Sequence, residues 1–292
     1  MIDGSPLRVS FQGEHGAYGE EAILGYFGPR DAQPIGAPTF GAAARLVESG
    51  SVAAAMLPIE SSRAGTVGDA VDVLIAGSLR VRGELLLPVR HQLLALPGVQ
   101  IGEIERVVSH PQALAQCEGL LTEHGWQPVP GGDTASAARS LAESGDRHTA
   151  VIASVHAATR HGLEILADLG EDRNLTRFVI VTLPDRELAR GTGPLAPSSD
   201  GPRASIISFE TKHVPGALHD ALGAFAEAGV NLSRIESRPT RNVQWEYRFL
   251  VQIEGDTDEA PASQALVTLR QRAHGVEVLG NFPSARAPSP GR

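Results

Sequence analysis

Short apolar runs alternate with amphipathic helical patterns over the first 183 residues of the chain. The runs at 7–11, 53–57, 92–95, 106–109, 149–153 and 178–182 are predicted to be strands. Between them, apolar residues recur at positions i, i+3, i+4 and i+7 in the segments 19–26, 40–48, 113–124 and 135–143, which predicts helices. Strands that alternate with helices indicate a largely parallel α/β sheet.

The pattern changes after residue 183. Residues 184–203 are rich in Pro, Gly and Ser and have no periodicity, so this segment is predicted to be a linker. Strands at 205–209, 230–236, 245–253 and 276–279 and helices at 216–228 and 259–272 then follow in the order βαββαβ, which is the ferredoxin-like unit. The last segment, 284–292, is rich in Pro, Ser and Arg and is predicted to be disordered.

Charge and composition argue against several kinds of binding partner. The formal net charge of −9 disfavours nucleic acid and anionic membranes, so an anionic substrate would need locally placed Arg residues or helix N-termini. Cys117 is the only cysteine, which excludes an intramolecular disulfide and a Cys-rich metal site. The histidines show no HxxxH or HxH spacing, and GxGxxG and GxxxxGK[ST] motifs are absent, so neither a metal nor a cofactor is expected.

The beginning of the chain, MIDGSPLRVSF, lacks the charged n-region and apolar h-region of a signal peptide. No apolar stretch approaches the ~20 residues that a transmembrane helix needs. A soluble cytoplasmic protein is therefore expected.

Polar segments stand at five junctions between predicted strands and helices, where ligands bind in α/β domains. They are 12–18 (QGEHGAY), 58–67 (PIESSRAGTV), 109–112 (SHPQ), 133–136 (DTAS) and 174–178 (NLTRF). Each allows a structural interpretation, as a tight turn or a helix cap, and a functional one, as the wall of a polar pocket. Arg177 is unusual at a strand start, because an Arg there can bind a carboxylate through two hydrogen bonds.

Taken together, these segments resemble the successive signatures of the prephenate dehydratase family, in the order of that family. The matching segments are 11–22, 57–67, 109–117, 131–138 and 174–178. After the linker, 215–218 (PGAL) and 236–239 (ESRP) resemble the two markers of the regulatory ACT domain that follows the catalytic region in this family. A single segment would be weak evidence, but seven in sequence at family spacing make the resemblance specific, and it covers almost the whole chain.

The resemblance implies an α/β catalytic region of two lobes, similar to periplasmic solute-binding proteins, with the substrate cleft between them. One lobe would comprise roughly residues 1–90 and 170–183 and the other 91–169. The linker 184–203, a βαββαβ ACT domain over 204–283 and the tail 284–292 would complete the chain. A homodimer or homotetramer is also implied.

The activity implied is a carbon–oxygen lyase reaction of L-phenylalanine biosynthesis, in which prephenate loses CO₂ and hydroxide and becomes phenylpyruvate. Because the ring becomes aromatic, the reaction needs no cofactor. The family assigns an essential role to the Thr of the TRF motif, here Thr176, which would donate a hydrogen bond or relay a proton to the leaving oxygen. Arg177 would bind a carboxylate, and Glu60 is either a buried acid or an orienting group.

The remaining expected contacts also follow from the resemblance. Substrate would meet Ser61, Ser62, Ser109, Gln112, Thr134 and Phe178. Phenylalanine, the expected feedback inhibitor, would bind where paired ACT domains meet, at Gly216, Ala217, Leu218, Glu236, Ser237, Arg238 and Pro239.

One residue departs from the family pattern. Ser61 stands where the family usually has Asn, and its shorter hydroxyl would reach substrate less well, which leaves rate and substrate preference open. Two rival functions remain. An arogenate dehydratase would act on a substrate with an amino group in place of the side-chain keto group, and a non-catalytic amino-acid sensor would use the same lobes without turnover.

Overall fold

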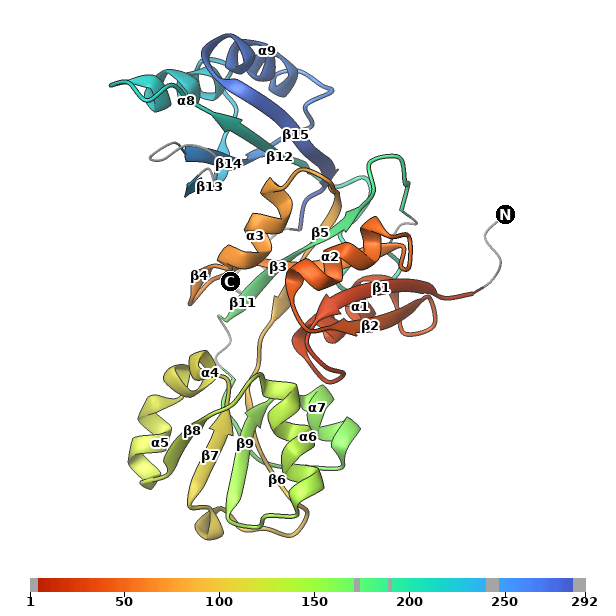
Figure 1. Ribbon diagram of the computed structural model, residues 1–292, viewed down its shortest axis with the longest axis vertical. Coiled ribbons are helices and arrows are strands. Elements are labelled where there is room, and N and C mark those ends of the chain that lie inside the picture. The colour runs from red at the N-terminus through yellow and green to blue at the C-terminus, as the bar shows by residue number, and fades with distance from the viewer. Residues whose placement is uncertain (1–4, 171–173, 189–190, 240–246, 286–292) are drawn as a thin grey trace.

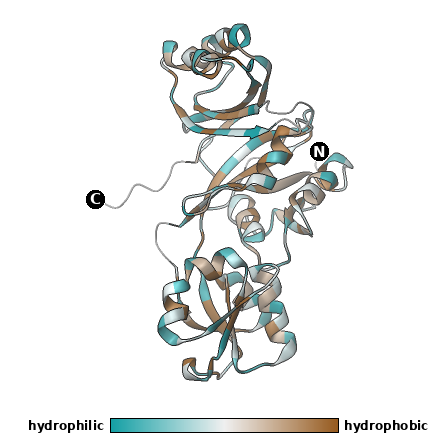
Figure 2. Ribbon diagram, turned by 60° about the vertical axis from the view of Figure 1, so that its left-hand side comes forward, coloured by the Kyte–Doolittle hydropathy of each residue, from teal (hydrophilic) through white to brown (hydrophobic). Residues whose placement is uncertain are grey.

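The structure is a computed structural model that describes residues 5–170, 174–188, 191–239 and 247–285. Three α/β layers are stacked along the long axis of the molecule: the C-terminal domain, a first lobe in the middle and a second lobe at the other end (Figure 1). Figure 2 shows that hydrophobic residues concentrate on the strands inside these layers. No helix of the described residues is long and apolar enough to cross a membrane.

The first lobe is a mixed sheet in the order β2-β1-β3-β11-β5, with β4 paired to β3. Its strands are β1 (Leu7–Gln12), β2 (Ala32–Ala37), β3 (Ala54–Ser61), β4 (Gly65–Thr66), β5 (Arg80–Pro88) and β11 (Leu175–Thr182). Helix α1 (Tyr18–Phe27) packs in one apolar core, and α2 (Phe40–Glu48) and α3 (Gly68–Ile75) pack in the core on the other face.

The second lobe repeats this arrangement with a sheet in the order β10-β6-β9-β7-β8. Its strands are β6 (Gln92–Ala95), β7 (Arg106–Ser109), β8 (Gln127–Pro130), β9 (Thr149–Ala153) and β10 (Glu164–Asp168). The 3-10 turn η1 (Ile101–Glu103) precedes β7. Helices α4 (Pro111–Gln116) and α5 (Glu118–His124) cover one face, and α6 (Thr134–Ser144) and α7 (Val155–His161) cover the other.

The sheets are less parallel than the alternating pattern predicts. Strands β1, β2 and β3 are parallel to one another, as are β7, β8 and β9. Strand β11, however, runs antiparallel to both β3 and β5, and β6 runs antiparallel to β9 and β10. The reason is that the chain leaves the first lobe after β5 and re-enters it with β11 from the second lobe, so β11 enters the sheet from the opposite end.

The C-terminal domain has the predicted βαββαβ order. Its elements are β12 (Arg203–Glu210), α8 (Ala217–Glu227), β13 (Leu232–Pro239), β14 (Tyr247–Glu254), α9 (Ala262–Arg272) and β15 (His274–Pro283). They form an antiparallel sheet in the order β13-β14-β12-β15. Together with the two lobes, this domain confirms the fold class predicted from the sequence.

Both faces of this C-terminal sheet are covered. One face packs on α8 and α9. From the other face, Ile206, Leu250 and Phe282 join the same apolar core as α2, α3 and β3 of the first lobe. Gly280 lies so close to β5 that a Cβ atom there would collide with the backbone carbonyl of Val81. The domain is therefore packed on the first lobe through side chains as well as joined to it by the chain.

The segment 184–203 contains no helix or strand among its described residues before β12 begins. Leu188 and Leu195 nevertheless pack against the core around α1, and the amide of Leu195 donates to the carbonyl of Gly25 at 2.8 Å. Most of the predicted tail, 286–292, lies outside the described residues.

Candidate functional site

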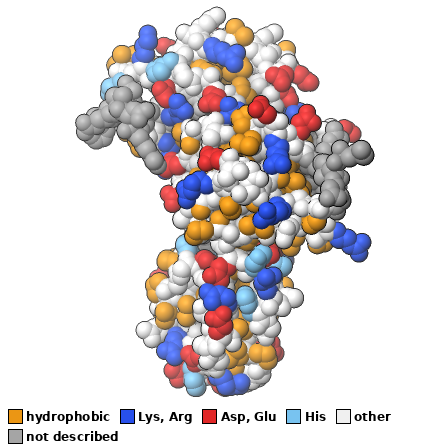
Figure 3. All heavy atoms as spheres, turned by 45° about the vertical axis from the view of Figure 1, so that its right-hand side comes forward, with side chains coloured by type: hydrophobic (Ala, Val, Ile, Leu, Met, Phe, Trp, Pro, Cys, Tyr) orange, Lys and Arg blue, Asp and Glu red, His pale blue; other side chains and the backbone are white. Residues whose placement is uncertain are grey.

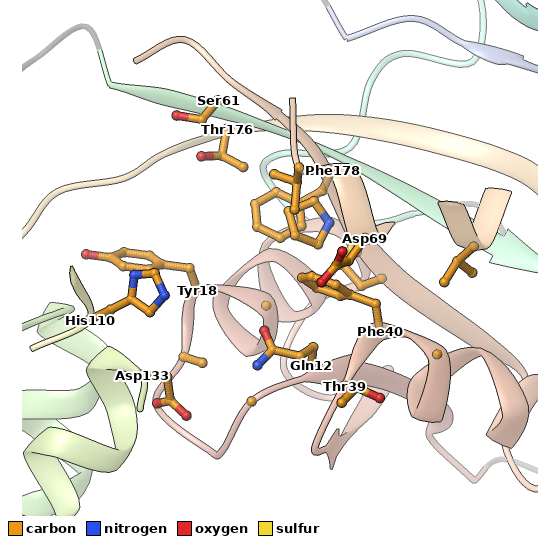
Figure 4. A pocket seen from close by; sticks show the side chains of 18 of the residues that line it. Gln12, Tyr18, Thr39, Phe40, Ser61, Asp69, His110, Asp133, Thr176 and Phe178 are labelled. Carbon is orange, nitrogen blue, oxygen red and sulfur yellow. The ribbon is translucent and has the colours of Figure 1, made fainter. Parts of the chain in front are cut away.

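A cleft of about 960 Å³ lies between the two lobes and continues along α2 and α3 of the first lobe. Its walls come from the loops after β1 and β2, from β3 and β11, from α2 and α3, from the starts of α4 and α6, and from the segments that join the lobes. Figure 4 shows part of this lining, with Ser61, Thr176 and Phe178 on one side and His110 and Asp133 on the other. In the space-filling view of Figure 3, Arg and Lys side chains on the drawn face are interspersed with Asp and Glu rather than gathered in one patch.

Thr176 and Phe178 both line the cleft from β11, where alternate residues share a face. Thr176 is 9% exposed and pairs with Ser61 of β3 in the sheet. Its hydroxyl has no hydrogen-bond partner within the described part of the chain. The hydroxyl is therefore available to a substrate in the cleft.

Arg177 lies between these two residues on β11 and does not line the cleft. Its Nε lies 3.2 Å from Glu60 Oε2, and its Nη1 lies 3.0 Å from Glu84 Oε2. Strand alternation turns the guanidinium to the face opposite Thr176, where it pairs with the two glutamates, and the expected contact of Arg177 with a substrate carboxylate stays a prediction. Glu60 accompanies it there and is likewise absent from the cleft lining.

Of the three serines predicted to meet substrate, only Ser61 lines the cleft. Its Oγ accepts from the amides of Arg63 and Ala64, both at 3.3 Å. Ser62 instead fixes the start of β11: its Oγ accepts from the amide of Leu175 at 2.9 Å, and its own amide donates to the Leu175 carbonyl at 2.8 Å.

Ser109 is fully buried in β7, and its Oγ donates to the carbonyl of Ile152 at 2.6 Å. Neither Ser62 nor Ser109 is among the residues that line the cleft, and both hydroxyls hold backbone in place, so their contacts with substrate stay predictions. The cap of α4 is His110, whose Nδ1 accepts from the amide of Gln112 at 3.2 Å.

The second lobe contributes the predicted residues Gln112 and Thr134. Asp133 caps α6 by accepting from the amide of Ser136 at 2.7 Å, so helix α6 begins at the cleft wall with Thr134. The partial positive charge of that helix end favours an anionic group in the cleft. For Asp133, capping and lining the cleft are thus compatible, and the sequence had left the choice between them open.

Four further cleft residues form a hydrogen-bonded chain that sequence reasoning missed. The hydroxyl of Tyr18 lies 2.9 Å from His91 Nδ1, and His91 Nε2 lies 3.2 Å from Gln116 Oε1, which also accepts from Asn174 Nδ2 at 3.3 Å. Burial lowers the pKa of His91 and raises the pKa of Tyr18 well above its usual value. The chain joins both lobes and both connecting segments.

Each of these four residues stands in or beside a recognised sequence feature, but no spacing relates them. His91 immediately precedes a predicted strand and Tyr18 ends the Gly-rich turn, 73 positions away. They meet where the chain passes to the second lobe after β5 and where it returns before β11. Among the described residues, no group of three or more His, Cys, Asp or Glu side chains could hold a metal ion.

The lobes also contact each other beside the cleft, around Glu20 of α1. Its carboxylate lies 2.7 Å from His15 Nδ1 and 3.0 Å from Nε2 of His156 in α7, and it accepts from the amide of Gly16 at 2.6 Å. Burial alone would raise the pKa of Glu20, but the hydrogen bonds from His156, Gly16 and His15 outweigh it and lower the pKa to about 2. The same contact raises the pKa of His156.

Within one chain, the residues predicted to bind the effector lie at two separate places. Ala217 and Leu218 line a second cavity of about 360 Å³ with 211–215, Tyr247 and Phe249. Gly216 precedes α8 with φ of 84°, a left-handed conformation that favours glycine. This cavity lies on the side of the domain away from the first lobe.

The second predicted marker lies on β13, where its residues alternate in exposure. Ser237 and Pro239 are exposed, whereas Glu236 and Arg238 face the first lobe. Glu236 accepts from Thr66 Oγ1 at 2.6 Å, and Arg238 Nε lies 2.7 Å from Asp72 Oδ1. A single chain therefore does not bring the two markers into one pocket.

Comparisons with known proteins agree with this architecture. The profile described as prephenate dehydratase matches residues 9–186, and that of the ACT domain matches residues 205–271. An Arabidopsis thaliana protein named arogenate dehydratase/prephenate dehydratase 1, chloroplastic, is 38% identical over 297 residues, which cover 96% of this chain and 73% of that protein.

Two solved structures are similar over nearly the whole chain. A prephenate dehydratase from Arthrobacter aurescens in complex with L-Phe is 33% identical with a TM-score of 0.84, covering 96% of this chain and 90% of that one. GqqA, described as a novel type of quorum quenching acylase, is 34% identical with a TM-score of 0.83, covering 95% and 98%. The chain belongs to the prephenate dehydratase family and combines the family's two-lobed region with a C-terminal ACT domain.

Proposed function

We propose that this protein is a prephenate dehydratase, which converts prephenate to phenylpyruvate, CO₂ and water. The observation that carries the proposal is the Thr176 hydroxyl, which lies in the cleft between the lobes and has no partner within the described part of the chain. The family match and the two-lobed relatives support the same reaction class. We also propose the domain limits expected from the sequence: a catalytic region over 1–183, a linker over 184–203 and an ACT domain over 204–283.

The reaction breaks two bonds of the ring substrate. The bond to the ring carboxylate breaks and releases CO₂, its electron pair enters the ring, and the C–O bond opposite breaks as hydroxide leaves. Thr176 donates a hydrogen bond to the leaving oxygen and passes its own proton to it, and solvent water that enters the cleft returns a proton to the threonine. Gln112, Thr134, Ser61 and Phe178 surround the substrate, and the N-terminus of α6 stabilises one of its carboxylates.

Arogenate is the competing substrate, because close relatives carry both substrates in their names. The two substrates differ only where a keto group replaces an amino group. We infer prephenate as the main substrate, and turnover of each compound by the purified protein compares them directly. A higher kcat/KM for arogenate would reverse the preference while leaving the dehydratase reaction in place.

A hydrolytic acylase would need an activated nucleophile. Within the described residues, the hydroxyls of Ser61, Thr134 and Thr176 in the cleft have no hydrogen bond to a histidine. For these Ser and Thr hydroxyls, the cleft therefore favours donation of a hydrogen bond to a leaving group over nucleophilic attack. Release of a carboxylic acid from an N-acyl substrate at a rate above that of prephenate turnover would contradict this choice.

The decisive experiment follows the absorbance of phenylpyruvate after purified protein is mixed with prephenate. We expect turnover by the wild type and a loss of ~10²–10³ in kcat for Thr176→Ala, because one positioned donor is removed. Thr182→Ser is the matched control on the same strand, since its hydroxyl bonds to the carbonyls of Leu183 and Arg186 outside the cleft. Native circular dichroism with a Thr176→Ala kcat within about threefold of wild type would refute the assignment.

We further propose that L-phenylalanine inhibits the enzyme through the ACT domain, and that the protein is a homodimer or homotetramer in the cytoplasm. The support is the L-Phe complex of the Arthrobacter relative and the cavity beside α8. The plant relative is named as chloroplastic, so cell fractionation tests the compartment and light scattering tests the assembly. Absence of both inhibition and calorimetric binding at millimolar phenylalanine would refute the regulatory proposal.

A further inference from the structure

A fully buried carboxylate lies where the ACT domain packs on the first lobe. Glu84 of β5 has no exposed surface. Its Oε2 accepts from Arg177 Nη1 and from Gln252 Nε2, both at 3.0 Å. Its Oε1 accepts from Ser284 Oγ at 2.9 Å and from the amide of Ala285 at 2.8 Å. Gln252 belongs to the ACT domain, and Ser284 and Ala285 directly follow its last strand, so the ACT domain and the residues after it complete the hydrogen bonding of a catalytic-lobe carboxylate.

The remaining partner of Glu84, Arg177, is adjacent in the chain to Thr176, the candidate catalytic residue. Arg177 follows Thr176 in β11, with its side chain on the opposite face of the sheet. The guanidinium is held between Glu84 and Glu60, at 3.0 and 3.2 Å. Because Arg177 and Thr176 are consecutive residues of β11, a displacement of the Arg177 backbone would be passed on to Thr176. The pairing of Glu84 with Arg177 is thus one covalent step from the backbone that carries the Thr176 hydroxyl.

Two ion pairs also join the ACT sheet to the first lobe. Arg80 Nη2 of β5 lies 2.6 Å from Glu277 Oε1 of β15, and Arg238 of β13 pairs with Asp72 of α3 at 2.7 Å. These ion pairs are partly exposed, whereas Gln252 is 1% exposed. Partly exposed pairs tolerate small displacements because water can replace a partner, but a buried carboxylate cannot lose its donors without a large cost.

We propose that Glu84 is a positioning residue that couples the seating of the ACT domain to the orientation of Thr176. With the ACT sheet seated, Gln252, Ser284 and Ala285 share the carboxylate with Arg177. When the sheet shifts, those donors withdraw, the carboxylate draws more strongly on Arg177, and β11 moves. An effector that binds one seating better than the other then changes the rate at the cleft. This inference rests on the proposed dehydratase function and deepens it.

The test compares steady-state kinetics of Glu84→Gln, Gln252→Leu and the double variant. Each single change is expected to lower kcat by ~10- to 100-fold, because misplacement of a reacting group by a remote change has effects of this size. KM should change less than kcat, since Glu84 and Gln252 do not line the cleft. The double variant should lose much less than the product of the two single losses, as expected for residues in one network.

Gln264→Leu is the matched control, an exposed Gln to Leu change on α9 of the same domain, and it should leave kcat unchanged. Glu84→Asp keeps the charge with a shorter side chain and should recover part of the activity lost in Glu84→Gln. Single variants with kcat within twofold of wild type, or losses that multiply in the double variant, would overturn the proposal.

A readout that does not depend on turnover keeps this inference separate from the proposed function. Amide hydrogen exchange over 175–178 of β11 should be faster in Gln252→Leu than in wild type, and unchanged in Gln264→Leu. Faster exchange in a protein that turns over neither prephenate nor arogenate would refute the function but retain the coupling. Equal exchange in wild type and Gln252→Leu would overturn the coupling even if the wild type is active. If Glu84→Gln does not fold, Gln252→Leu alone decides.

Discussion

Replacing Glu20 with glutamine should weaken the contact between the lobes in a pH-dependent way. The Glu20 carboxylate joins α1 of the first lobe to α7 of the second through His156, and it also holds His15 and the amide of Gly16. Arg160 lies 4.0 Å from the same carboxylate. The side chain is buried, so solvent does not replace these partners.

The size of the effect follows from the pKa of Glu20, which falls from an ordinary value of 4.5 to about 2. Since one pKa unit corresponds to about 1.4 kcal/mol, this lowering contributes up to ~3 kcal/mol to the free energy of unfolding. A lowered carboxyl pKa contributes above pH 4.5, and the contribution is lost as the pH falls toward 2. The amide of the Glu20→Gln variant would retain the shape of the side chain but lose the charge that attracts the histidines.

The contribution of His156 to stability depends on pH in the opposite direction. Its pKa is raised above 6.5 by the hydrogen bond to Glu20, so its contribution is complete below pH 6.5 and is lost as the pH rises through the raised value. The difference between wild type and Glu20→Gln should therefore be largest between pH 4.5 and 6.5, where both groups are charged. It should shrink by pH 8.5, ~2 units above the usual pKa of His.

Urea unfolding of both proteins at pH 5.5, 7 and 8.5, followed by far-UV circular dichroism, measures this difference. Glu123→Gln on the surface of α5 is the control, because an exposed change of this kind alters stability by only ~0.5 kcal/mol. A Glu20→Gln protein as stable as the control at pH 5.5, or a difference that does not depend on pH, would refute the reasoning.

Three further predictions concern the cleft and the ACT domain. Ser61→Asn restores the usual family residue and should leave kcat/KM for prephenate equal or higher; a large loss would mean that the cleft is adapted to the smaller side chain. His91→Phe removes the link between Tyr18 and Gln116 and should lower kcat by ~10-fold or more through misplaced cleft residues, with native circular dichroism; an unchanged kcat would show that this hydrogen-bonded chain is dispensable. Gly216→Val places a β-branched residue at φ of 84° and should weaken inhibition by phenylalanine without changing the uninhibited kcat. Titration of the inhibitor measures this effect, and inhibition equal to that of the wild type would exclude this turn from the effector site.

Local patterns in the sequence predict many elements of this fold, although β2, β5, β8 and β10 are not among the predicted strands and the helix predicted at 113–124 is divided into α4 and α5. Strands 92–95, 106–109 and 149–153 have the limits expected from their apolar runs, and the helix expected at 40–48 is α2. These signals are local, because hydrophobic periodicity and capping residues act within a few positions. The segments around Ser61, Gln112, Thr134 and Thr176 are far apart in the chain and were expected at one substrate cleft, and each of these four residues lines the cleft between the lobes.

Only the tertiary structure decides which side of a strand faces the cleft. Thr176 and Arg177 are neighbours in one motif, and a shift of one residue would exchange their faces, so the sequence suggests a role for both. The same limit applies to Ser109, which is a polar residue at the expected strand end but is turned into the sheet.

Long-range pairing is the second feature that the sequence leaves open. Glu84 receives hydrogen bonds from Gln252 and Ser284, 168 and 200 positions away, and His91 meets Tyr18 across 73 positions. No periodicity or turn rule relates residues at such distances. These contacts exist because β11 returns to the first lobe and because the ACT sheet packs on that lobe. Both arrangements bury one shared apolar core, which forms only in the folded chain.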